Sequence, residues 1–347
     1  MEQYRVSVIG AAGLVGQELV SILEERKFPF SSLNLYASDD AGRKTVIGIN
    51  QAFPIQLLDH SSERNAFQGA NLVFFAEGDK LSRHLVNQAA QAGATVIDSS
   101  SVFRLEPDVP LVVPEVNAGD IQNHHGIIAS PGCSTILLNM VLSPLHKINP
   151  VKRVIVSTYQ SISGAGLPAM NELTQQTQKI LAGEIPRPAV FPHEIAFNVL
   201  PQVDVFLDNG YTKEEWQLMD ETRKIIHDNG ILVSATCVWV PVYKGYCQAV
   251  TVDFSNEINT DIATSILAES PGIRLVDDTG ISLYPQPRAA TGTDMVMVGR
   301  VRQDTFNLNS LVFWIAADNI RKGAALNMVQ IAEEIHRKGW LKVENQR

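Results

Sequence analysis

The sequence predicts an α/β protein of two domains, an N-terminal Rossmann-type doubly wound domain followed by an α+β domain. Three observations support this prediction. A chain of 347 residues can bury two cores. Its first hundred residues alternate short β-rich runs with helical ones, whereas after about residue 150 the strands are longer and alternate in polarity. The first pattern is typical of a parallel sheet between helices, and the second of an antiparallel or mixed sheet with one covered face.

In the first domain, strands and helices are predicted to follow each other in strict alternation. The strands are "YRVSVIG", "SLNLYAS", "NLVFFAEG" and "ATVIDSSS", and the helices are "LVGQELVSILEER" and "SRHLVNQAAQAG". The run "NLVFF" is almost wholly apolar, which indicates a central strand. Such alternation predicts right-handed βαβ units.

The second domain is predicted from longer segments. Its strands are "RVIVSTYQS", "LVSATCVWVPV", "YCQAVTVDF" and "MVMVGRVRQD", and its amphipathic helices are "GLPAMNELTQQTQKILAGE" and "TKEEWQLMDETRKIIHDNG". A turn, "DNIRKGAA", precedes a last helix, "NMVQIAEEIHRKGW". We place the first domain at residues 1–132 together with the last helix at about 324–347, and the second domain at 133–323.

Composition excludes several classes of function. The formal charge of -9 argues against a surface for nucleic acid or anionic lipid. No apolar run approaches the roughly 18 residues of a membrane span, and "MEQYRVSVIG" is not a signal peptide. The three cysteines are too few for a disulfide framework or a closed zinc site, so we expect a cytoplasmic protein without metal.

A glycine-rich turn, "GAAGLVG", joins the first strand to the first helix, with Gly10, Gly13 and Gly16 at its key positions. Glycine permits a tight turn and lets the backbone approach a pyrophosphate, whose charge is stabilised by the helix N-terminus. Because the triplet follows a predicted strand and opens a predicted helix, it indicates a dinucleotide site. The alternative is an ordinary strand-to-helix turn.

The residues after the second strand should distinguish NAD from NADP. An acidic side chain there bonds the ribose 2′-hydroxyl of NAD, whereas arginine accepts the 2′-phosphate of NADP. Asp39 and Asp40 favour NAD, while Ser38, Arg43 and Lys44 favour NADP. A solvated loop explains the two aspartates equally well.

Cys133 lies in "SPGCSTILLNM", between a Pro-Gly turn and an apolar predicted helix that Ser134 and Thr135 could cap. A helix N-terminus lowers the pKa of a thiol, and a thiolate can attack an activated acyl group and hold it as a thioester. With a nicotinamide cofactor, hydride transfer to that thioester would give an aldehyde. The alternative is a small apolar filler, the function that we assign to Cys237 inside a strand.

Taken together, these motifs resemble the aspartate-semialdehyde dehydrogenase family of the bacterial type. The resemblance runs nearly end to end, through "GAAGLVG", "SSSVFRLEPDVPLVVPEVN", "PGCSTI", "STYQSISGAG", "IAFNVLPQVDVFLDNGYTKEE", "VSATCV" and "ADNIRKGAALN". It implies NADPH-dependent conversion of β-aspartyl phosphate to aspartate semialdehyde through a cysteine thioester, in amino-acid biosynthesis. It also implies NADP as cofactor, with NAD as the alternative, a homodimer or homotetramer, and dinucleotide-binding and catalytic/dimerisation roles for the two domains.

The resemblance assigns roles to individual residues. Cys133 corresponds to the acyl-enzyme nucleophile, and Gln160 to a glutamine that orients the substrate. Arg104 corresponds to a guanidinium that binds the substrate phosphate, for which its planar geometry is suited; the alternative is a surface salt bridge. The other matches are cofactor-binding residues, at the pyrophosphate turn and near the nicotinamide: Gly10, Ala12, Gly13, Leu14, Val15, Gly16, Ser163, Gly164 and Asn319.

Four motifs depart from the family pattern. Gly132 replaces an asparagine before the nucleophile, and Tyr246 replaces the catalytic histidine of a Gly-His-x-Glu motif, in which Gln248 also replaces the glutamate. Gln217 replaces a phosphate-binding lysine, and Trp239 an arginine that binds the substrate carboxylate. Each lost charge-assisted contact is worth about 1.5–3 kcal/mol, so a doubly anionic substrate should bind poorly.

Tyrosine titrates near 10 and is therefore a weak base at neutral pH. Among the histidines, His193 is the nearest candidate for a substitute, and we expect it to be structural. Three functions remain open: an aspartate-type semialdehyde dehydrogenase, a relative acting on a less anionic acyl compound, and a non-catalytic paralogue. We adopt the first for the reaction class, with Cys133, Gln160 and Tyr246 as catalytic residues and a small molecule as partner.

Overall fold

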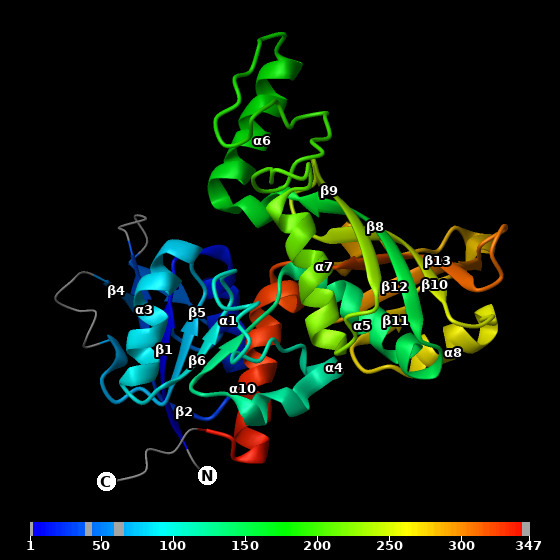
Figure 1. The fold of residues 1–347 in the computed structure, drawn as a ribbon. Helices are drawn as coiled ribbons and strands as arrows, with labels where there is room; N and C mark the ends of the chain where they lie inside the picture. The colour runs from blue at the N-terminus through cyan, green and yellow to red at the C-terminus, as the bar shows by residue number, and fades with distance from the viewer. Residues whose placement is uncertain (1–2, 39–43, 59–65, 342–347) are drawn as a thin grey trace. The chain divides into compact units, whose positions relative to one another are not determined.

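A computed structural model of the chain describes residues 3–38, 44–58 and 66–341. The chain forms two compact units, one of Met1–Gly132 with Ala324–Arg347 and one of Cys133–Gly323 (Figure 1). The predicted fold class, a Rossmann-type sheet domain and a second domain of mixed helices and strands, is confirmed.

Within the described residues, the first unit is built on a seven-stranded sheet of order β3-β4-β2-β1-β5-β6-β7. Neighbouring strands are parallel except for β3 and β4. The chain runs from β1 to β2 on one side and later to β5 on the other, so the strand order reverses between β1 and β5. The strands are β1 Tyr4–Ile9, β2 Phe30–Ala37, β3 Thr45–Ile47, β4 Ala52–Leu57, β5 Leu72–Phe75, β6 Thr95–Asp98 and β7 Ile127–Ala129.

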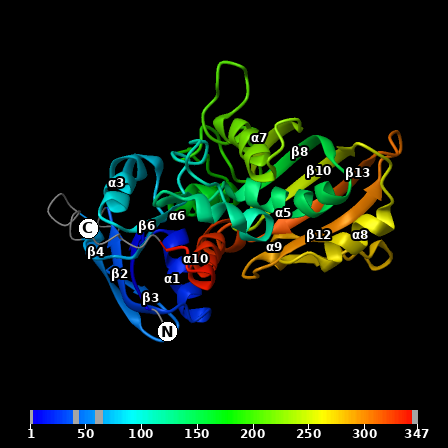
Figure 2. The same ribbon diagram turned by 60° about the horizontal axis from the view of Figure 1, so that its bottom comes forward.

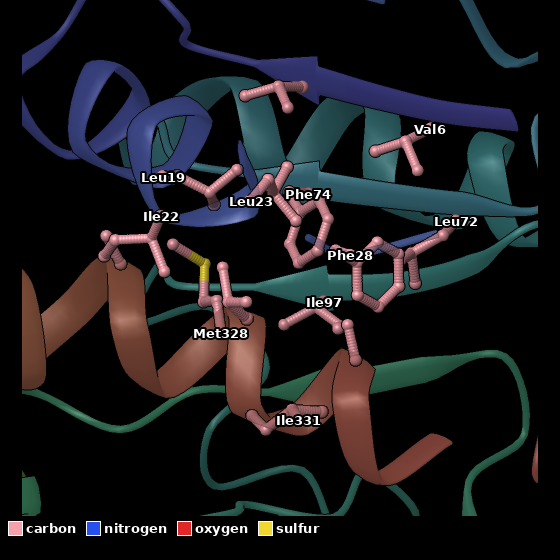
Figure 3. Close-up of a cluster of buried hydrophobic side chains, with 14 of the residues drawn as sticks. Val6, Leu19, Ile22, Leu23, Phe28, Leu72, Phe74, Ile97, Met328 and Ile331 are labelled. Carbon is pink, nitrogen blue, oxygen red and sulfur yellow. The ribbon is translucent and has the colours of Figure 1, made fainter. Parts of the chain in front are cut away.

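Two helices from opposite ends of the chain, α1 (Leu14–Glu25) and α10 (Leu326–Lys338), pack against one face of this sheet (Figure 3). Leu19 and Leu23 of α1 and Met328 of α10 meet Phe74 and Ile97 of the central strands, all fully buried. Burying a side chain of this size contributes roughly 1.5–3 kcal/mol. The helix α3 (Asp79–Gln91) contacts β5 and β6, and the short elements α4 (Pro114–Asn117) and η1 (Ala118–Asn123) contact α10.

The prediction of strict strand-helix alternation is wrong between β2 and β5. There β3 and β4 pair antiparallel, and β4 extends the sheet parallel to β2. The hydrophobic pattern misses this hairpin because β3 has three residues and β4 contains Pro54, which donates no backbone hydrogen bond.

The second unit is built on a six-stranded sheet, counted over the described residues, of order β11-β12-β13-β10-β8-β9. It is mixed, since β8–β9 and β11–β12 are parallel and the other pairs antiparallel. The strands are β8 Val151–Ser161, β9 Leu232–Val240, β10 Tyr246–Phe254, β11 Ile273–Leu275, β12 Val296–Gln303 and β13 Ser310–Ala317.

Three helices, α5 (Cys133–Ile148), α7 (Lys213–Ile226) and α8 (Thr260–Glu269), pack on this second sheet (Figure 2). Alternate residues of β8 are buried, while Ile155 and Tyr159 between them are 41% and 37% exposed. The sheet therefore has one covered and one partly open face, as its alternating polarity predicts. The remaining helical elements are η2 Ile162–Ala165, α6 Gly166–Leu181, η3 Thr279–Ile281 and α9 Pro287–Ala290.

The segment "DNIRKGAA" is more ordered than the predicted turn. Its Arg321–Ala325 portion forms a π-helix that continues into α10. Asp318 starts it, because its Oδ1 accepts hydrogen bonds from the N–H groups of Ile320 and Arg321 at 2.8 and 2.9 Å. The side chain thus replaces the acceptors that a helix start lacks.

Candidate active site

The glycine-rich turn of the first unit lies at the carboxyl end of β1. Gly10 has φ +85°, and a Cβ there would collide with the Ala76 carbonyl oxygen. A Cβ on Gly16 would likewise collide with the Gly10 oxygen. Both positions therefore require glycine, the first for its backbone conformation and the second for close approach of helix and turn.

The start of α1 suits an anion. Gly13 occupies the N-cap without a side-chain hydrogen bond, and no acidic residue lies in the first turn. The first N–H groups of a helix have no intrahelical acceptor and carry partial positive charge. The residues present therefore fit the pyrophosphate of a dinucleotide.

At the end of β2, the residues that would contact the adenosine ribose are only partly described. Ser38 is exposed after β2, and Lys44 is exposed before β3. Asp39, Asp40 and Arg43 lie outside the described residues. The described neighbour of Ser38 is Glu77, whose carboxylate accepts a long hydrogen bond of 3.5 Å from the serine hydroxyl.

Cys133 is the first residue of α5, in the second unit, and is half-buried. It lies beside Gly323, because a Cβ added to Gly323 would be 3.2 Å from the Cβ of Cys133. The thiol therefore stands at a helix N-terminus, the placement that favours a thiolate. Ser134 does not cap the helix as expected, because it is the second helical residue and its hydroxyl accepts a hydrogen bond from Gln160.

Strand register brings the predicted catalytic residues to one face of the second sheet. Gln160 of β8 is paired with Trp239 of β9, and Thr158 is paired with Gln248 of β10. Paired residues point to the same face, and residues two apart share it, so Tyr246 also lies on this face. Gln248 connects this face of the sheet to the start of α5, because its Nε2 donates a hydrogen bond to the Ser134 carbonyl oxygen at 2.7 Å. Its Oε1 is buried without a hydrogen-bond partner among the described residues.

Gln160 is held by a polar network that includes a residue the sequence analysis missed. Its Nε2 lies 3.0 Å from Ser134 Oγ, 3.3 Å from Thr158 Oγ1 and 3.1 Å from Glu214 Oε1. An amide nitrogen has two hydrogens, so it serves two of these acceptors at a time. Glu214 is placed by the capping box that Thr212 and Glu215 form at the start of α7. The "TKEE" sequence carries this signal.

Tyr246 is almost wholly buried, at 3% exposure, and its ring reaches the predicted nicotinamide neighbour Gly164. A Cβ on Gly164 would collide with the Tyr246 hydroxyl oxygen and lie 3.1 Å from the Trp239 ring. Trp239 in turn packs edge-on against Phe191, with ring centroids 5.6 Å apart. Glycine at 164 thus makes room for two aromatic side chains, neither of which carries a charge.

The electrostatic setting of Tyr246 keeps its hydroxyl protonated. Burial raises the pKa of Tyr246 well above 10.0, and negative charge on the nearby Cys133 and Glu214 raises it further. The hydroxyl forms no hydrogen bond with another described residue. It can donate a hydrogen bond to a bound oxygen atom at neutral pH, and it is not a base there.

Cys237 and Cys247 are buried, inert thiols. Burial raises the pKa of both thiols above the ordinary value of 9.0. The pKa of Cys247 is raised to about 12. Cys237 faces Glu215, whose Oε1 accepts the Cys237 N–H at 2.8 Å. Cys247 is one residue from Gln248 and points to the opposite face of the sheet.

Asn319 organises the other predicted nicotinamide neighbours of the second unit. Its Oδ1 accepts from the Gly245 N–H at 2.9 Å and from the hydroxyl groups of Ser161 and Ser163 at 3.3 Å. Its Nδ2 is 3.0 Å from Ser163 Oγ. The side chain therefore ties the end of β8 to the turn before β10.

The remaining predicted residues are placed as follows. Arg104 belongs to the first unit, where its Nη2 donates to the Ser99 carbonyl oxygen at 2.7 Å. It is half-buried rather than a surface residue. Gln217 is half-exposed on α7, and His193 is exposed in a loop rather than packed in a structural role.

No group of three or more His, Cys, Asp or Glu side chains among the described residues could hold a metal ion. Within the same residues, no helix is both long and apolar enough to cross a membrane.

The free energy of unfolding should fall as pH rises above about 9. Burial raises the folded-state pKa of Cys237, Tyr246 and Cys247 above the ordinary values of 9.0 and 10.0. The unfolded chain therefore loses these protons first, so the stability present below pH 9 is lost as the pH rises. Urea unfolding at pH 7.5, 9.0 and 10.5 measures the effect, and Cys247→Ala should weaken it. A midpoint that is constant over this range would contradict the assignment.

Comparison with known proteins first defines the class of the chain. The model "Semialdehyde dehydrogenase, NAD binding domain" matches residues 5–124, and "Semialdehyde dehydrogenase, dimerisation domain" matches residues 142–322. Together these matches define a two-domain, nicotinamide-dependent semialdehyde dehydrogenase class of protein.

Individual proteins of similar sequence and structure identify the family within this class. The chain is 44% identical over 337 residues to aspartate-semialdehyde dehydrogenase of Synechocystis, which covers 97% of this chain and 98% of the relative. It is 42% identical over 342 residues to that of Bacillus subtilis, covering 95% and 96%. Crystal structures of aspartate semialdehyde dehydrogenase II from Vibrio cholerae, one complexed with ASA, match with 40% identity, a TM-score of 0.92 and coverage of 97% and 99%. The chain therefore belongs to the aspartate-semialdehyde dehydrogenase family, and its predicted class, an NAD(P)-dependent oxidoreductase, is confirmed.

Proposed function

We propose that the chain converts an acyl phosphate of the β-aspartyl type to a semialdehyde through a thioester on Cys133. The observation that carries this proposal is the position of Cys133 at the N-terminus of α5, on the sheet face that Gln160 and Tyr246 share. The sulfur attacks the acyl carbon and phosphate leaves, which gives the thioester. Reduction then releases the aldehyde and regenerates the thiolate.

Gln160 and Tyr246 have separate roles in this proposal. Gln160 orients the acyl group, because Glu214 and Ser134 hold its amide in place. Tyr246 donates a hydrogen bond to the acyl oxygen as charge develops on it during attack. The tyrosine therefore provides the donor function expected of the absent histidine, but it does not act as a base at neutral pH.

The phosphate of the substrate is assigned to a positively charged residue, and the rest of the substrate to uncharged residues. Arg104 would bind the phosphate, since its guanidinium offers planar, paired donors. Gln217 and Trp239 would line the rest of the substrate site without adding positive charge.

We propose residues 1–132 with 324–347 as the nucleotide-binding domain and 133–323 as the catalytic and dimerisation domain, in agreement with the extents of the two family matches.

The cofactor supplies hydride when bound. The turn from Gly10 to Gly16, with Ala12, Gly13, Leu14 and Val15, would hold its pyrophosphate. Ser163, Gly164 and Asn319 would contact its nicotinamide end. We propose NADP as a cofactor, following the family resemblance, with NAD as a competing one because of the acidic residues at the end of β2.

We propose a homodimer or homotetramer that uses the partly open face of the second sheet. Ile155 and Tyr159 are exposed on this face, and Tyr159 packs on Trp314 with ring centroids 5.2 Å apart. The matching family model is described as a dimerisation domain. Apolar side chains gathered on a sheet face favour burial against a second copy.

A second candidate function is a dehydrogenase for a less anionic acyl compound. Trp239 favours it, because this residue is 9% exposed and packs in an apolar cluster with Phe191 and Ile162. A carboxylate placed against such a surface would lose hydration without gaining a charged partner. An uncharged acyl chain would lose nothing comparable.

Steady-state oxidation of aldehydes distinguishes these functions. Aspartate semialdehyde and butanal should each be assayed with phosphate and with NAD or NADP, beside enzyme blocked at its thiols. The first function predicts measurable oxidation of aspartate semialdehyde, with kcat/KM below about 10⁴ M⁻¹s⁻¹ because cations are missing. A higher kcat/KM for butanal would favour the second function. Absence of turnover with both would contradict both and indicate a non-catalytic paralogue.

A further inference from the structure

The carboxylate of Glu214 lies close to the nucleophile, within the second unit. Glu214 is the second residue of α7, and its Oε1 is 3.1 Å from Gln160 Nε2. The same nitrogen lies 3.0 Å from the hydroxyl oxygen of Ser134, the residue that follows Cys133. One amide group therefore connects this carboxylate to the turn of α5 that carries the thiol.

The hydroxyl group of Tyr246 lies near both the carboxylate and the thiol. Negative charge on Cys133 and on Glu214 adds to the effect of burial in raising the pKa of Tyr246, which places both groups within electrostatic reach of the hydroxyl. Cys133 and Glu214 are each half-buried, so water can reach them. An acyl group on the sulfur would therefore have a hydrogen-bond donor, a carboxylate and solvent as neighbours.

The residue three positions after Glu214 influences which nucleophile can attack such an acyl group. Gln217 lies there on α7, in place of the lysine that the family pattern predicts for phosphate, and residues three apart are neighbours on a helix. A phosphate dianion that approaches a thioester on Cys133 would gain no cation from position 217 and would meet the charge of Glu214. A water molecule is uncharged, so this arrangement does not repel it.

We propose that water also resolves the thioester on Cys133, with Glu214 as the general base, so that the protein oxidises an aldehyde to a carboxylic acid without phosphate. A carboxylate has several acceptor sites, and Glu214 can accept from Gln160 and from a water molecule at once. The water oxygen attacks the acyl carbon while a proton passes from it to Glu214. Tyr246 donates a hydrogen bond to the acyl oxygen as it becomes negative.

The carbon–sulfur bond then breaks, the sulfur leaves with the bonding electrons as a thiolate, and Glu214 releases its proton to solvent. Over the whole reaction, an aldehyde, water and the oxidised nicotinamide give a carboxylate, the reduced nicotinamide and two protons, so no further oxidant is needed. The inference rests on the proposed function, because it starts from the same thioester. It goes beyond that function because the acyl acceptor is water.

Oxidation of aspartate semialdehyde or butanal with NADP in phosphate-free buffer tests the proposal in wild type, Glu214→Gln and Asp220→Asn. Glutamine keeps an acceptor for Gln160 and removes the base. Asp220 is the matched control, a half-buried carboxylate on the same helix that accepts from Arg223 at 2.9 Å. Wild type should turn over continuously and release the carboxylic acid, which is identified by mass spectrometry.

Glu214→Gln should lower this phosphate-free turnover by at least about 10²-fold, the usual contribution of a general base. The acyl group should then accumulate on Cys133, where mass spectrometry of the intact protein and its peptides detects it. Asp220→Asn should change the turnover by less than about twofold. Deuterated water should slow wild type more than Glu214→Gln, because a proton moves during the attack that the base assists.

A wild-type acyl-enzyme that persists in the absence of phosphate would overturn the inference and leave the proposed function intact. This outcome is measured on wild type, so it does not depend on the folding of a variant. Equal phosphate-free turnover in wild type and Glu214→Gln would also overturn the inference alone. Absence of nicotinamide reduction with either aldehyde, with and without phosphate, would contradict the proposed function as well.

Discussion

Replacing Cys133 with alanine is expected to lower kcat by at least about 10⁴-fold, because neither of the other two cysteines can take its place as the nucleophile. Cys237 and Cys247 are buried, and the pKa of each is raised, so neither is a thiolate at neutral pH. Removal of a nucleophile from a catalytic unit typically costs this much, since the steps that depend on it are lost together. Initial rates with the best aldehyde from the substrate screen measure the effect.

The matched control is Cys247→Ala, which removes a thiol from the opposite face of the second sheet. It should retain kcat within about threefold, with a modest loss of stability from the small cavity. Equal loss of activity in both variants would show that the effect is structural. Full activity in Cys133→Ala would exclude the thioester route.

Replacing Tyr246 with phenylalanine is expected to lower kcat by about 10²–10³-fold with little change in KM for the cofactor. The variant removes one hydroxyl and keeps the ring that packs against Gly164 and Trp239. Loss of a single preorganised donor to a developing oxyanion has this magnitude. Thermal unfolding should be nearly unchanged, because the hydroxyl has no hydrogen-bond partner among the described residues.

The pH profile separates a donor from a base. Wild-type kcat should show no limb near pH 6.5 that is attributable to residue 246, since the pKa of Tyr246 is raised well above 10.0 by burial and neighbouring negative charge. Tyr246→His introduces a group that ordinarily titrates near 6.5, so its kcat should rise with pH through about that value. Identical profiles for the two enzymes would contradict a role for this residue in proton transfer or oxyanion binding.

The parts of the fold with strong periodicity could be predicted from the sequence. The apolar run before Glu77, the glycine turn at Gly10 and the amphipathic helix that ends at Glu25 all correspond to elements of the first unit. The hairpin of β3 and β4 could not, because short strands with a proline carry little periodic signal. Tertiary contacts with β2 decide its structure.

In the candidate site, too, the features with a local sequence signal could be predicted, and the contacts between distant residues could not. The setting of Cys133 between a turn and a helix is local, so it could be inferred from neighbouring residues. The contact of Glu214 with Gln160 spans 54 positions, and that of Glu77 with Ser38 spans 39. Such pairs depend on strand order and register, which a single sequence does not specify. The capping signal in "TKEE" locates the start of α7 but not the partner of Glu214.

Mass spectrometry of the protein after brief exposure to an acyl phosphate, without nicotinamide, tests the central claim most directly. The account predicts one acyl group per chain, on the peptide that contains Cys133, and its disappearance as aldehyde when a reduced nicotinamide is added. An unmodified Cys133, or an acyl group found on the peptide of Cys247 instead, would contradict it.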